Sequence, residues 1–455
     1  MSLLKRFPIL LASILAFILT AWSLHNSFST ANLVDRNPSQ ICPRDPATSY
    51  FQGQFSNPAG VLSVLLLVGG DTVQKAVAQM TGGRHAVFTP VVFSFGWVSY
   101  SVSMVATAFG DAIFLPRPEY SGYVVNVGTA KAGVEDIASG DRRENRSWHL
   151  GRLMRDLELS VKTEKDEIFR QSGLLVTVYR LDPARGGGHP RLHPKKDWLW
   201  WIFAWAIPCQ LVIAMLPWIF QGDWSIFLIT STGNLLAILT ASLPSMRNLQ
   251  YRKDSQQSYA LTRGNGHRHV FIIRPDSYHV DKDENEGNII ASRLPYLDDL
   301  AVNIERADRT ARGLSIVCAV FWIMLLVAVG GLKSGTWYLF GAGTLGMLFN
   351  ILISSYPRDP AAYGLPLKEE ARFGFRDTPS VPRKRVQEVL LELEVKYPGA
   401  GHALKPLFFT TSLLSKKDEV WKEDAYSWET AKQRLLDLKK DGNQVSQQPS
   451  TEGQS

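Results

Sequence analysis

Asp71 and Lys75 are the residues whose types and spacing suggest chemistry most strongly. They lie four residues apart in an apolar stretch, so on a helix they share one face and can form an ion pair. A charged side chain inside lipid is costly, and such residues usually face a bundle interior or a cavity. The plainer alternatives are a structural ion pair, or a helix shifted so that both side chains reach the lipid headgroups.

If the chain is an enzyme, Asp71 is the candidate catalytic acid. Gln74, Lys75, Asn234 and Asn350 are then the candidate substrate-binding residues. A carboxyl group in a low-dielectric medium tends to keep its proton, whereas a nearby ammonium group favours the ionised form. Asn234 and Asn350 lie in other apolar stretches, where an amide more often bonds a neighbouring helix than a ligand. The sequence therefore leaves open whether the chain is an enzyme.

The sequence predicts neither a metal site nor a cofactor. His267 and His269 would share one face of a strand, but no third ligand is evident, so exposed hairpin histidines are the simpler interpretation. Cys209 and Cys318 lie in apolar stretches and Cys42 stands alone, so we expect no disulfide framework. P-loop, Gly-x-Ser-x-Gly and His-Glu-x-x-His motifs are absent.

The elements that would position these residues are apolar stretches of the length that crosses a bilayer as a helix, about 20 residues. They run over Phe7–Leu24, Ala59–Met80, Val87–Gly110, Trp198–Phe220, Trp224–Leu243, Leu314–Leu332 and Thr336–Tyr356. Many of the chain's 13 Trp lie at the ends of these stretches, as in the aromatic belts of membrane proteins. Lys5 and Arg6 before the first stretch also fit a signal peptide, but its length favours an uncleaved span.

The later stretches pair into hairpins with short turns, so the long polar segments between them must face one side of the membrane. These segments, 111–197, 245–310 and 357–455, carry most of the chain's 49 Lys and Arg. The positive-inside bias therefore places them in the cytosol. Asn145-Arg146-Ser147 is a glycosylation acceptor sequence, which is usable only if that segment is luminal.

The fold class we expect is an all-α membrane protein with three transmembrane helical hairpins and an N-terminal span. A small α+β domain built from the long polar loops completes it. The boundaries are 1–56 for the N-terminal span or signal anchor and its linker, 57–110, 198–244 and 311–356 for the hairpins, 111–197 and 245–310 for the polar loops, and 357–455 for a polar tail with a disordered end.

The polar segments contain patterns of regular structure. Alternating Val, Tyr and Leu predict strands, and leucines at helical spacing predict helices. The strands are Tyr123–Val127, Leu174–Leu181, Tyr259–Thr262 and His269–Ile273, the last two forming a hairpin around Gly264-Asn265-Gly266; the helices are Ser147–Val161, Leu297–Arg312, Arg383–Lys396 and Val420–Lys440.

A faint internal repeat supports the hairpin interpretation. Trp224, Gly233 and Pro244 have the same spacing as Trp337, Gly346 and Pro357, and each set closes a span. Duplicated membrane units are common in transporters, which often bind substrate between the repeats. Trp and Pro at span ends also have a generic interfacial explanation.

A set of short motifs runs between Asn57 and Phe349. They are Asn57-Pro58-Ala59-Gly60, Gly69-Gly70-Asp71 with Val73-Gln74-Lys75, Phe93-Ser94-Phe95-Gly96-Trp97, Glu144-Asn145-Arg146-Ser147-Trp148 with Leu150-Gly151-Arg152-Leu153, Asp197-Trp198-Leu199-Trp200-Trp201, Gly222-Asp223-Trp224 and Leu261-Thr262-Arg263-Gly264-Asn265-Gly266. The set resembles a family of fungal multi-pass integral membrane proteins of largely unassigned function. Members are often encoded in secondary-metabolite gene clusters, similar in kind to the membrane proteins of indole-diterpene clusters. The resemblance implies no catalytic residues.

The leading hypothesis is a multi-pass membrane protein of the endoplasmic reticulum or another endomembrane. It would be an accessory or lipid- and terpenoid-handling component of fungal secondary-metabolite biosynthesis. The expected partners are membrane lipid and either a terpenoid-like small molecule or pathway enzymes. We expect no nucleic acid, because anionic headgroups are the simpler partner for the net charge of +7. The alternatives are a transporter or channel, and a membrane scaffold that recruits pathway enzymes.

Overall fold

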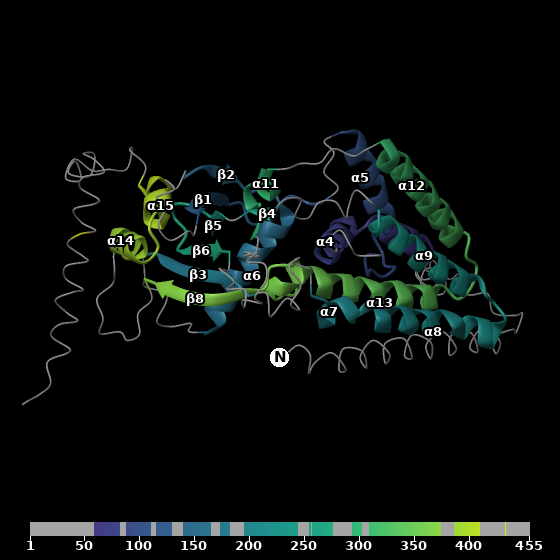
Figure 1. The fold of residues 1–455 in the computed structure, drawn as a ribbon. Coiled ribbons are helices and arrows are strands. Elements are labelled where there is room, and N and C mark those ends of the chain that lie inside the picture. Colours follow the sequence, from purple (N-terminus) through teal and green to yellow (C-terminus); the bar gives the residue numbers. More distant parts are fainter. Residues whose placement is uncertain are drawn as a thin grey trace, which may run out of the picture. The chain divides into compact units, whose positions relative to one another are not determined.

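The computed structural model describes residues 59–81, 88–110, 115–129, 140–164, 173–182, 195–243, 254–255, 257–275, 294–302, 309–374, 386–409 and 433. The chain divides into two compact units (Figure 1). Unit 1 takes residues 1–116, 196–250 and 304–356, and unit 2 takes 117–195, 251–303 and 357–455. The predicted span Phe7–Leu24 and the predicted helix Val420–Lys440 lie outside the described residues.

Unit 1 is built from apolar helices. They are α3 (Ala59–Leu67), α4 (Gly70–Met80), α5 (Trp97–Phe109), α7 (Trp198–Trp201), α8 (Phe203–Gln221), α9 (Ser225–Ala241), α12 (Arg309–Gly330) and α13 (Thr336–Ser355). Within the described part of the chain, three helical segments are long and apolar enough to cross a membrane: Trp198–Gln221, Arg309–Gly330 and Thr336–Ser355. α5 and α9 are apolar but shorter. This architecture is compatible with a membrane protein.

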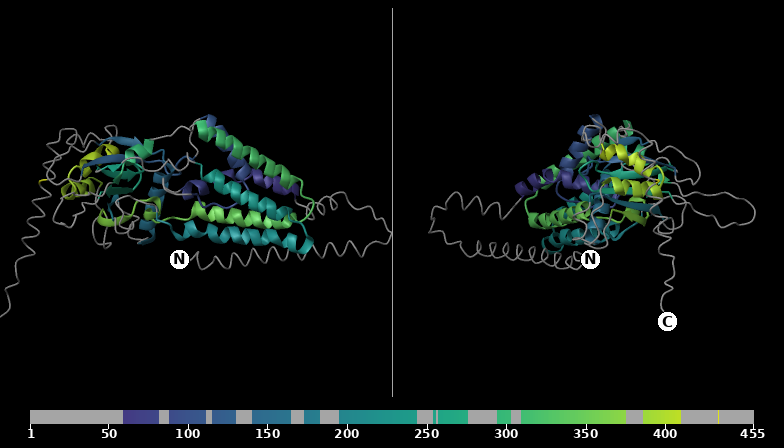
Figure 2. Two further views of the ribbon diagram at one scale, coloured as in Figure 1. Left: turned by 45° about the vertical axis from the view of Figure 1, so that its right-hand side comes forward. Right: turned by 90° about the vertical axis from the view of Figure 1, so that its left-hand side faces the viewer.

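The helices of unit 1 do not all pack on their neighbours in sequence. α8 packs against α9, as a hairpin would. α12, however, lies mainly against α5 and to a lesser and equal extent against α3 and α9, and α13 lies mainly against α8 and α4 (Figure 2). The short turns after α8 and α12 nevertheless meet, because the Ser334 hydroxyl donates to Asp223 Oδ2 at 3.0 Å. Hydrogen bonds from Ser225 and Ser334 lower the pKa of Asp223. We call this the turn end of unit 1.

At the other end of the same helices, α7 begins and α13 finishes. The Trp198 ring meets the Tyr356 ring edge-on, with centroids 4.9 Å apart. α12 also begins at this end, with Arg309 and Arg312 in its first turns. We call this the basic end of unit 1.

Two predicted spans are not continuous helices, and the expectation of unbroken helices there was wrong. Ala59–Met80 breaks at Gly69, whose φ of 89° separates α3 from α4. Val87–Gly110 is helical only from Trp97, after Gly96 at φ 93°. Only glycine adopts these left-handed conformations readily. From Phe88 to Gly96 the chain is irregular, and Thr89 onward is buried; we call it the 88–96 segment.

Unit 2 is an α/β structure around a six-stranded sheet of order β2-β1-β5-β6-β3-β8. The strands are β1 (Tyr123–Thr129), β2 (Arg142–Glu144), β3 (Leu175–Leu181), β5 (Gln257–Thr262), β6 (His269–Arg274) and β8 (Leu367–Phe373). β3 and β6 pair in parallel, and the other neighbours pair antiparallel. A separate two-stranded sheet joins β4 (Asp254–Ser255) to β7 (Leu294–Pro295).

Helices cover both faces of the six-stranded sheet. One core lies under α14 (Val386–Lys396) and α15 (Ala400–Phe408), the other under α6 (Trp148–Glu164), α11 (Leu297–Val302) and the 3₁₀ helix η2 (Pro360–Tyr363). Successive side chains of β1 point to opposite faces of the sheet, so Val124 belongs to the second core and Val125 to the first. Burying both faces of a sheet this way is the usual solution for a mixed sheet.

The structure confirms most of the predicted elements of the polar segments. The predicted strands correspond to β1, β3, β5 and β6, and the predicted helices at Ser147–Val161 and Arg383–Lys396 to α6 and α14. Gly264 and Gly266 adopt φ of 89° and 92° between β5 and β6. The helix expected over Leu297–Arg312 appears as α11 and the start of α12, with 303–308 outside the described residues. The segment after Tyr356, expected to be a separate tail, supplies β8, α14 and α15 to unit 2.

Three stretches of chain build unit 2, so they must all lie on one side of the membrane if unit 1 spans it. We predict that Arg117→Cys and Lys368→Cys are labelled by a membrane-impermeant maleimide from one face of sealed vesicles. Lys333→Cys at the turn end should be labelled only from the other face. All three native side chains are exposed, and a background with Cys42, Cys209 and Cys318 replaced by Ser isolates each signal. Labelling of Lys368→Cys and Lys333→Cys from the same face would contradict this topology.

Candidate functional site

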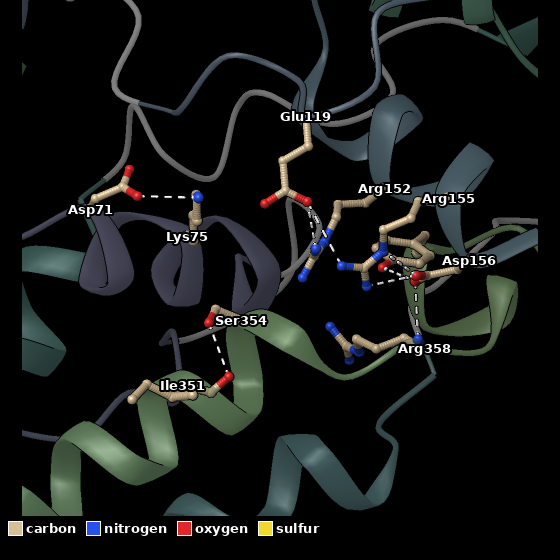
Figure 3. A network of polar contacts seen from close by, with 10 residues as sticks. Asp71, Lys75, Glu119, Arg152, Arg155, Asp156, Ile351, Ser354 and Arg358 are labelled. Atoms are coloured by element: carbon tan, nitrogen blue, oxygen red, sulfur yellow. Dashed lines mark hydrogen bonds and ion pairs between the residues drawn. The ribbon is translucent and has the colours of Figure 1, made fainter. Parts of the chain in front are cut away.

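The predicted ion pair forms, with Lys75 Nζ 3.1 Å from Asp71 Oδ2 (Figure 3). It lies just after the break at Gly69, with Asp71 in the first turn of α4, where a carboxylate also stabilises the helix dipole. The Asp71 side chain is 74% exposed and that of Lys75 32%. Both charges therefore lie on the outer surface of the described part of unit 1, and catalysis by Asp71 or binding by Gln74 and Lys75 stays a prediction.

Asn234 lies inside unit 1, in a network of amides around the 88–96 segment. Its Oδ1 accepts from the Phe93 backbone N–H at 3.0 Å, and its Nδ2 donates to Gln210 Oε1 at 3.1 Å. Gln210 Nε2 donates to the carbonyls of Phe93 and Ala342, both at 2.7 Å. Both peptide groups of Phe93 are thus satisfied by side chains of α8 and α9, as buried irregular backbone requires.

Asn350 holds the next residues of the same segment. Its Nδ2 donates to Ser94 Oγ at 2.7 Å and to the Val92 carbonyl at 3.4 Å. The Trp97 indole donates to that carbonyl too, at 3.0 Å. Asn234 and Asn350, predicted from their position in apolar stretches, therefore converge on one segment, and the interpretation as packing amides fits their bonds.

Three glycines also pack against the 88–96 segment, and two of them, Gly233 and Gly346, are the repeat-related pair. A Cβ on Gly346 would lie 1.8 Å from the Phe93 carbonyl oxygen, and a Cβ on Gly233 would lie 2.6 Å from the Phe93 ring. A Cβ on Gly343 would lie 2.5 Å from the Phe95 ring. Glycine at these positions lets the irregular chain pass against α9 and α13, since no other residue leaves that space.

A stack of aromatic rings completes this interior. The Trp322 ring lies between Phe93 and Trp97, with centroids 6.2 and 5.3 Å away and planes within 11°. Tyr100 meets Trp97 edge-on at 5.7 Å, and the Trp322 indole donates to Thr240 Oγ1 at 3.1 Å. Aromatic faces offer a large apolar surface for apolar groups, and their negative potential attracts cations.

Five buried side-chain polar atoms in the described part of unit 1 have no hydrogen-bond partner: the Tyr100 hydroxyl, Thr230 Oγ1, Ser231 Oγ, Arg312 Nε and Asn350 Oδ1. Two of them belong to residues already described around the 88–96 segment, Asn350 and Tyr100, which are 0% and 2% exposed. A ligand with one or two polar groups on an apolar skeleton suits such a set, because most of the interior is aromatic and the other amides are occupied. Asn234 and Asn350 thus lie together around the 88–96 segment, which we take as the candidate site, whereas Asp71 lies on the exposed side of α4.

Sequence reasoning missed Gln210 and Trp322. Gln210 is the polar residue of an otherwise apolar predicted span, the same signal that singled out Asn234, so it was detectable. Trp322 lies mid-span, away from the interface where Trp is usual, and it is 0% exposed. A tryptophan at that depth indicates a packed interior.

Unit 2 contains an ion network centred on α6 (Figure 3). Arg152, 1% exposed, donates to Glu119 Oε2 at 2.8 Å, and Arg155 Nη2 lies 2.8 Å from Asp156 Oδ1. Asp156 Oδ2 also accepts from the Arg358 backbone N–H at 3.0 Å and from the Tyr363 hydroxyl at 2.7 Å. Because its charge is paired and its lone pairs are used, Asp156 acts as a structural anchor.

The glycosylation acceptor sequence is folded into unit 2. Asn145 is 3% exposed, and its Nδ2, the atom that would carry a glycan, is buried. Its Oδ1 accepts from the Ser147 N–H at 2.9 Å, just before α6. A glycan there is incompatible with this fold, so the acceptor sequence gives no indication of the side of the membrane on which the polar segments lie.

No group of three or more His, Cys, Asp or Glu suited to a metal occurs in the described part of either unit. Burial and the nearby Arg263 lower the pKa of His267. His269 stacks on Phe271 with ring centroids 6.0 Å apart. His267 thus lies exposed in the connection between β5 and β6, as the simpler interpretation proposed, whereas His269 begins β6 and is partly buried.

Gly346→Ala tests whether close approach of the 88–96 segment holds unit 1 together. The new methyl group would overlap the Phe93 carbonyl, and we expect a loss of about 2 kcal/mol or more of stability. Gly313→Ala on α12 is the matched control, since nothing lies within 4 Å of its Cβ. That change should leave stability equal or raise it by up to about 1 kcal/mol. Thermal unfolding of the full chain in detergent measures both; equal unfolding temperatures would contradict the close packing.

Asp298 on α11 gives a pH-dependent prediction for unit 2. Burial, and then the charge of Asp141, raise the pKa of Asp298 to about 6, against an opposing effect of Arg143. The native state therefore binds this proton more tightly than the unfolded chain, so wild-type stability falls as pH rises from about 4 to about 6.

Asp298→Asn should remove that loss, so its stability advantage over the wild type grows across this window and persists above it. Asp299→Asn, which removes the same charge from the same turn, is the matched control. The measurement is thermal unfolding between pH 4 and 8. This range covers the window between the pKa of Asp298 in the unfolded chain and its pKa in the native state, and also the plateau above that window. Parallel curves for wild type and Asp298→Asn would refute the assignment.

Comparison with known proteins adds no relative: no family model, curated protein or solved structure matches this chain.

Proposed function

We propose that this chain is a multi-pass integral membrane protein that handles an apolar, terpenoid-like ligand in fungal secondary-metabolite biosynthesis, in the endoplasmic reticulum or another endomembrane. The observation that carries the proposal is the interior around the 88–96 segment. There, irregular backbone is fixed among apolar helices and lies beside the Phe93–Trp322–Trp97 stack. The metabolic context comes from the family resemblance of the motifs between Asn57 and Phe349.

The bonding in this interior supports an apolar ligand over a polar one. Gln210 and Asn234 already bond to backbone and to each other, so a sugar or nucleotide would find few free partners. Burying an unpaired polar group costs about 1–3 kcal/mol. A skeleton with one or two oxygens needs only the Asn350 carbonyl oxygen and the Tyr100 hydroxyl.

A transporter is the second candidate, and the helix breaks favour it. α4 and α5 both begin inside unit 1 after a left-handed glycine, and a Cβ on Gly96 would lie 2.5 Å from Gly69. Adjoining ends of interrupted helices are typical of secondary transporters, which use them at substrate sites. The Asp71–Lys75 pair beside the first break would then be the coupling pair.

Metabolite profiling tests the metabolic assignment. We expect a strain that lacks this gene to accumulate an intermediate that the intact strain converts, and the intact gene to reverse the change. An unchanged profile under conditions in which the gene is expressed would reject the assignment.

Complementation with variants tests the site. Trp322→Leu should fail to restore the product, because it removes the central ring of the stack. Phe321→Leu, at the next and 55% exposed position, should restore it. Membrane levels of both variants must match wild type. If both variants restored the product, the aromatic stack would have no part in the function.

Asp71→Ala separates the two candidates. Lost flux of a substrate across vesicles with normal product formation supports the transporter, and lost product with normal flux rejects it. Wild-type behaviour in both assays would leave the scaffold alternative, in which unit 2 recruits pathway enzymes.

A further inference from the structure

An exposed cation lies over aromatic rings at the basic end of unit 1. Lys196 Nζ is 4.2 Å from the centroid of the Trp200 ring and 5.9 Å from that of Trp201. The neighbouring Asp197 carboxylate accepts the Trp200 N–H at 3.0 Å, so it caps α7. The ammonium group is thus held over an aromatic face while it remains exposed.

The rings beneath this cation extend into an exposed apolar surface. Trp201 and Trp205 are 52% and 74% exposed, and Val212, on the same side of α8 two turns further on, is 59% exposed. Trp218, near the end of α8, is also exposed. The distance from Trp201 to Trp218 along a helix is about 26 Å, close to the thickness of a bilayer's hydrocarbon core. The two tryptophans therefore fit the two interfaces.

Charge distinguishes the two interfaces. Lys196, Arg309 and Arg312 lie at the basic end, whereas the described turn end carries Lys333 and Asp223, the latter bonded to Ser334. Exposed tryptophan beside a fixed cation suits the headgroup layer, where rings lie in the interface and ammonium groups meet phosphate.

We propose that Lys196, Trp200 and Trp201 form a binding site for the headgroup of an anionic phospholipid. The lysine pairs with the negative headgroup, the indoles lie at the glycerol level, and an acyl chain runs along the exposed side of α8 past Trp205 and Val212. The proposal requires that unit 1 lies in a bilayer, but it does not depend on the identity of the ligand inside it.

Native mass spectrometry of the full chain in detergent tests this site. The measured quantity is the ratio of the apparent Kd values for the first molecule of phosphatidylcholine and of phosphatidylserine. We expect a preference for phosphatidylserine of about fivefold, which corresponds to the attraction of one basic residue near an anionic surface. Lys196→Gln should bring the ratio close to one, and Lys196→Arg should restore it.

Lys333→Gln is the matched control, since it removes one exposed lysine from the turn end. It should keep the wild-type ratio. An unchanged ratio in Lys196→Gln, or an equal loss in Lys333→Gln, would overturn the site. So would displacement of phosphatidylserine by inorganic phosphate at constant ionic strength, which would point to a soluble anion. Failure of the wild type to retain either lipid would also overturn the site, and it would leave the proposed function untouched, because that function concerns the interior of unit 1.

Discussion

The need to satisfy buried peptide groups governs the structure of unit 1. The 88–96 segment lies among apolar helices without helical hydrogen bonds of its own, and an unpaired peptide group in such surroundings costs several kcal/mol. Gln210, Asn234 and Asn350 meet this need by bonding the backbone of Val92 and Phe93 and the Ser94 side chain. Polar side chains that look out of place in apolar helices therefore stabilise a buried segment that is not helical.

That requirement explains the glycines and the tryptophans together. A side-chain amide reaches a backbone carbonyl only if the helix carrying it approaches closely, and Gly233, Gly343 and Gly346 permit the approach. The close approach presses Phe93 onto Trp322, whose indole N–H needs a partner in turn and finds Thr240. Removing any one member leaves another buried polar group without a hydrogen bond. We therefore expect a single substitution in the network to cost more stability than its share of a substitution that replaces all members together.

Sequence patterns predicted the elements that obey a local period. The strands β1, β3, β5 and β6 and the helix α6 follow from alternation or helical spacing, because one or both faces are buried. β8 was missed because its sequence, Leu-Lys-Glu-Glu-Ala-Arg-Phe, has helix-forming residues and exposed charges, which suit an edge strand only once β3 is its neighbour. The break at Gly69 was missed because glycine also occurs inside membrane helices. Asn234 and Asn350 were found as intramembrane amides, but their shared target was not visible, since Gln210 and Phe93 are 117 residues apart.

The same network limits what unit 1 can recognise. Amides that hold backbone are unavailable to a ligand unless the 88–96 segment itself moves, and moving it would expose peptide groups that the helices now satisfy. A ligand that leaves the segment in place meets rings and few free polar atoms, so shape and aromatic contact would select it. A ligand that displaces the segment would have to replace its hydrogen bonds, which requires a polar molecule. A lipid-like ligand and a polar transported solute thus imply opposite behaviour of Phe93: fixed in the first case, displaced in the second.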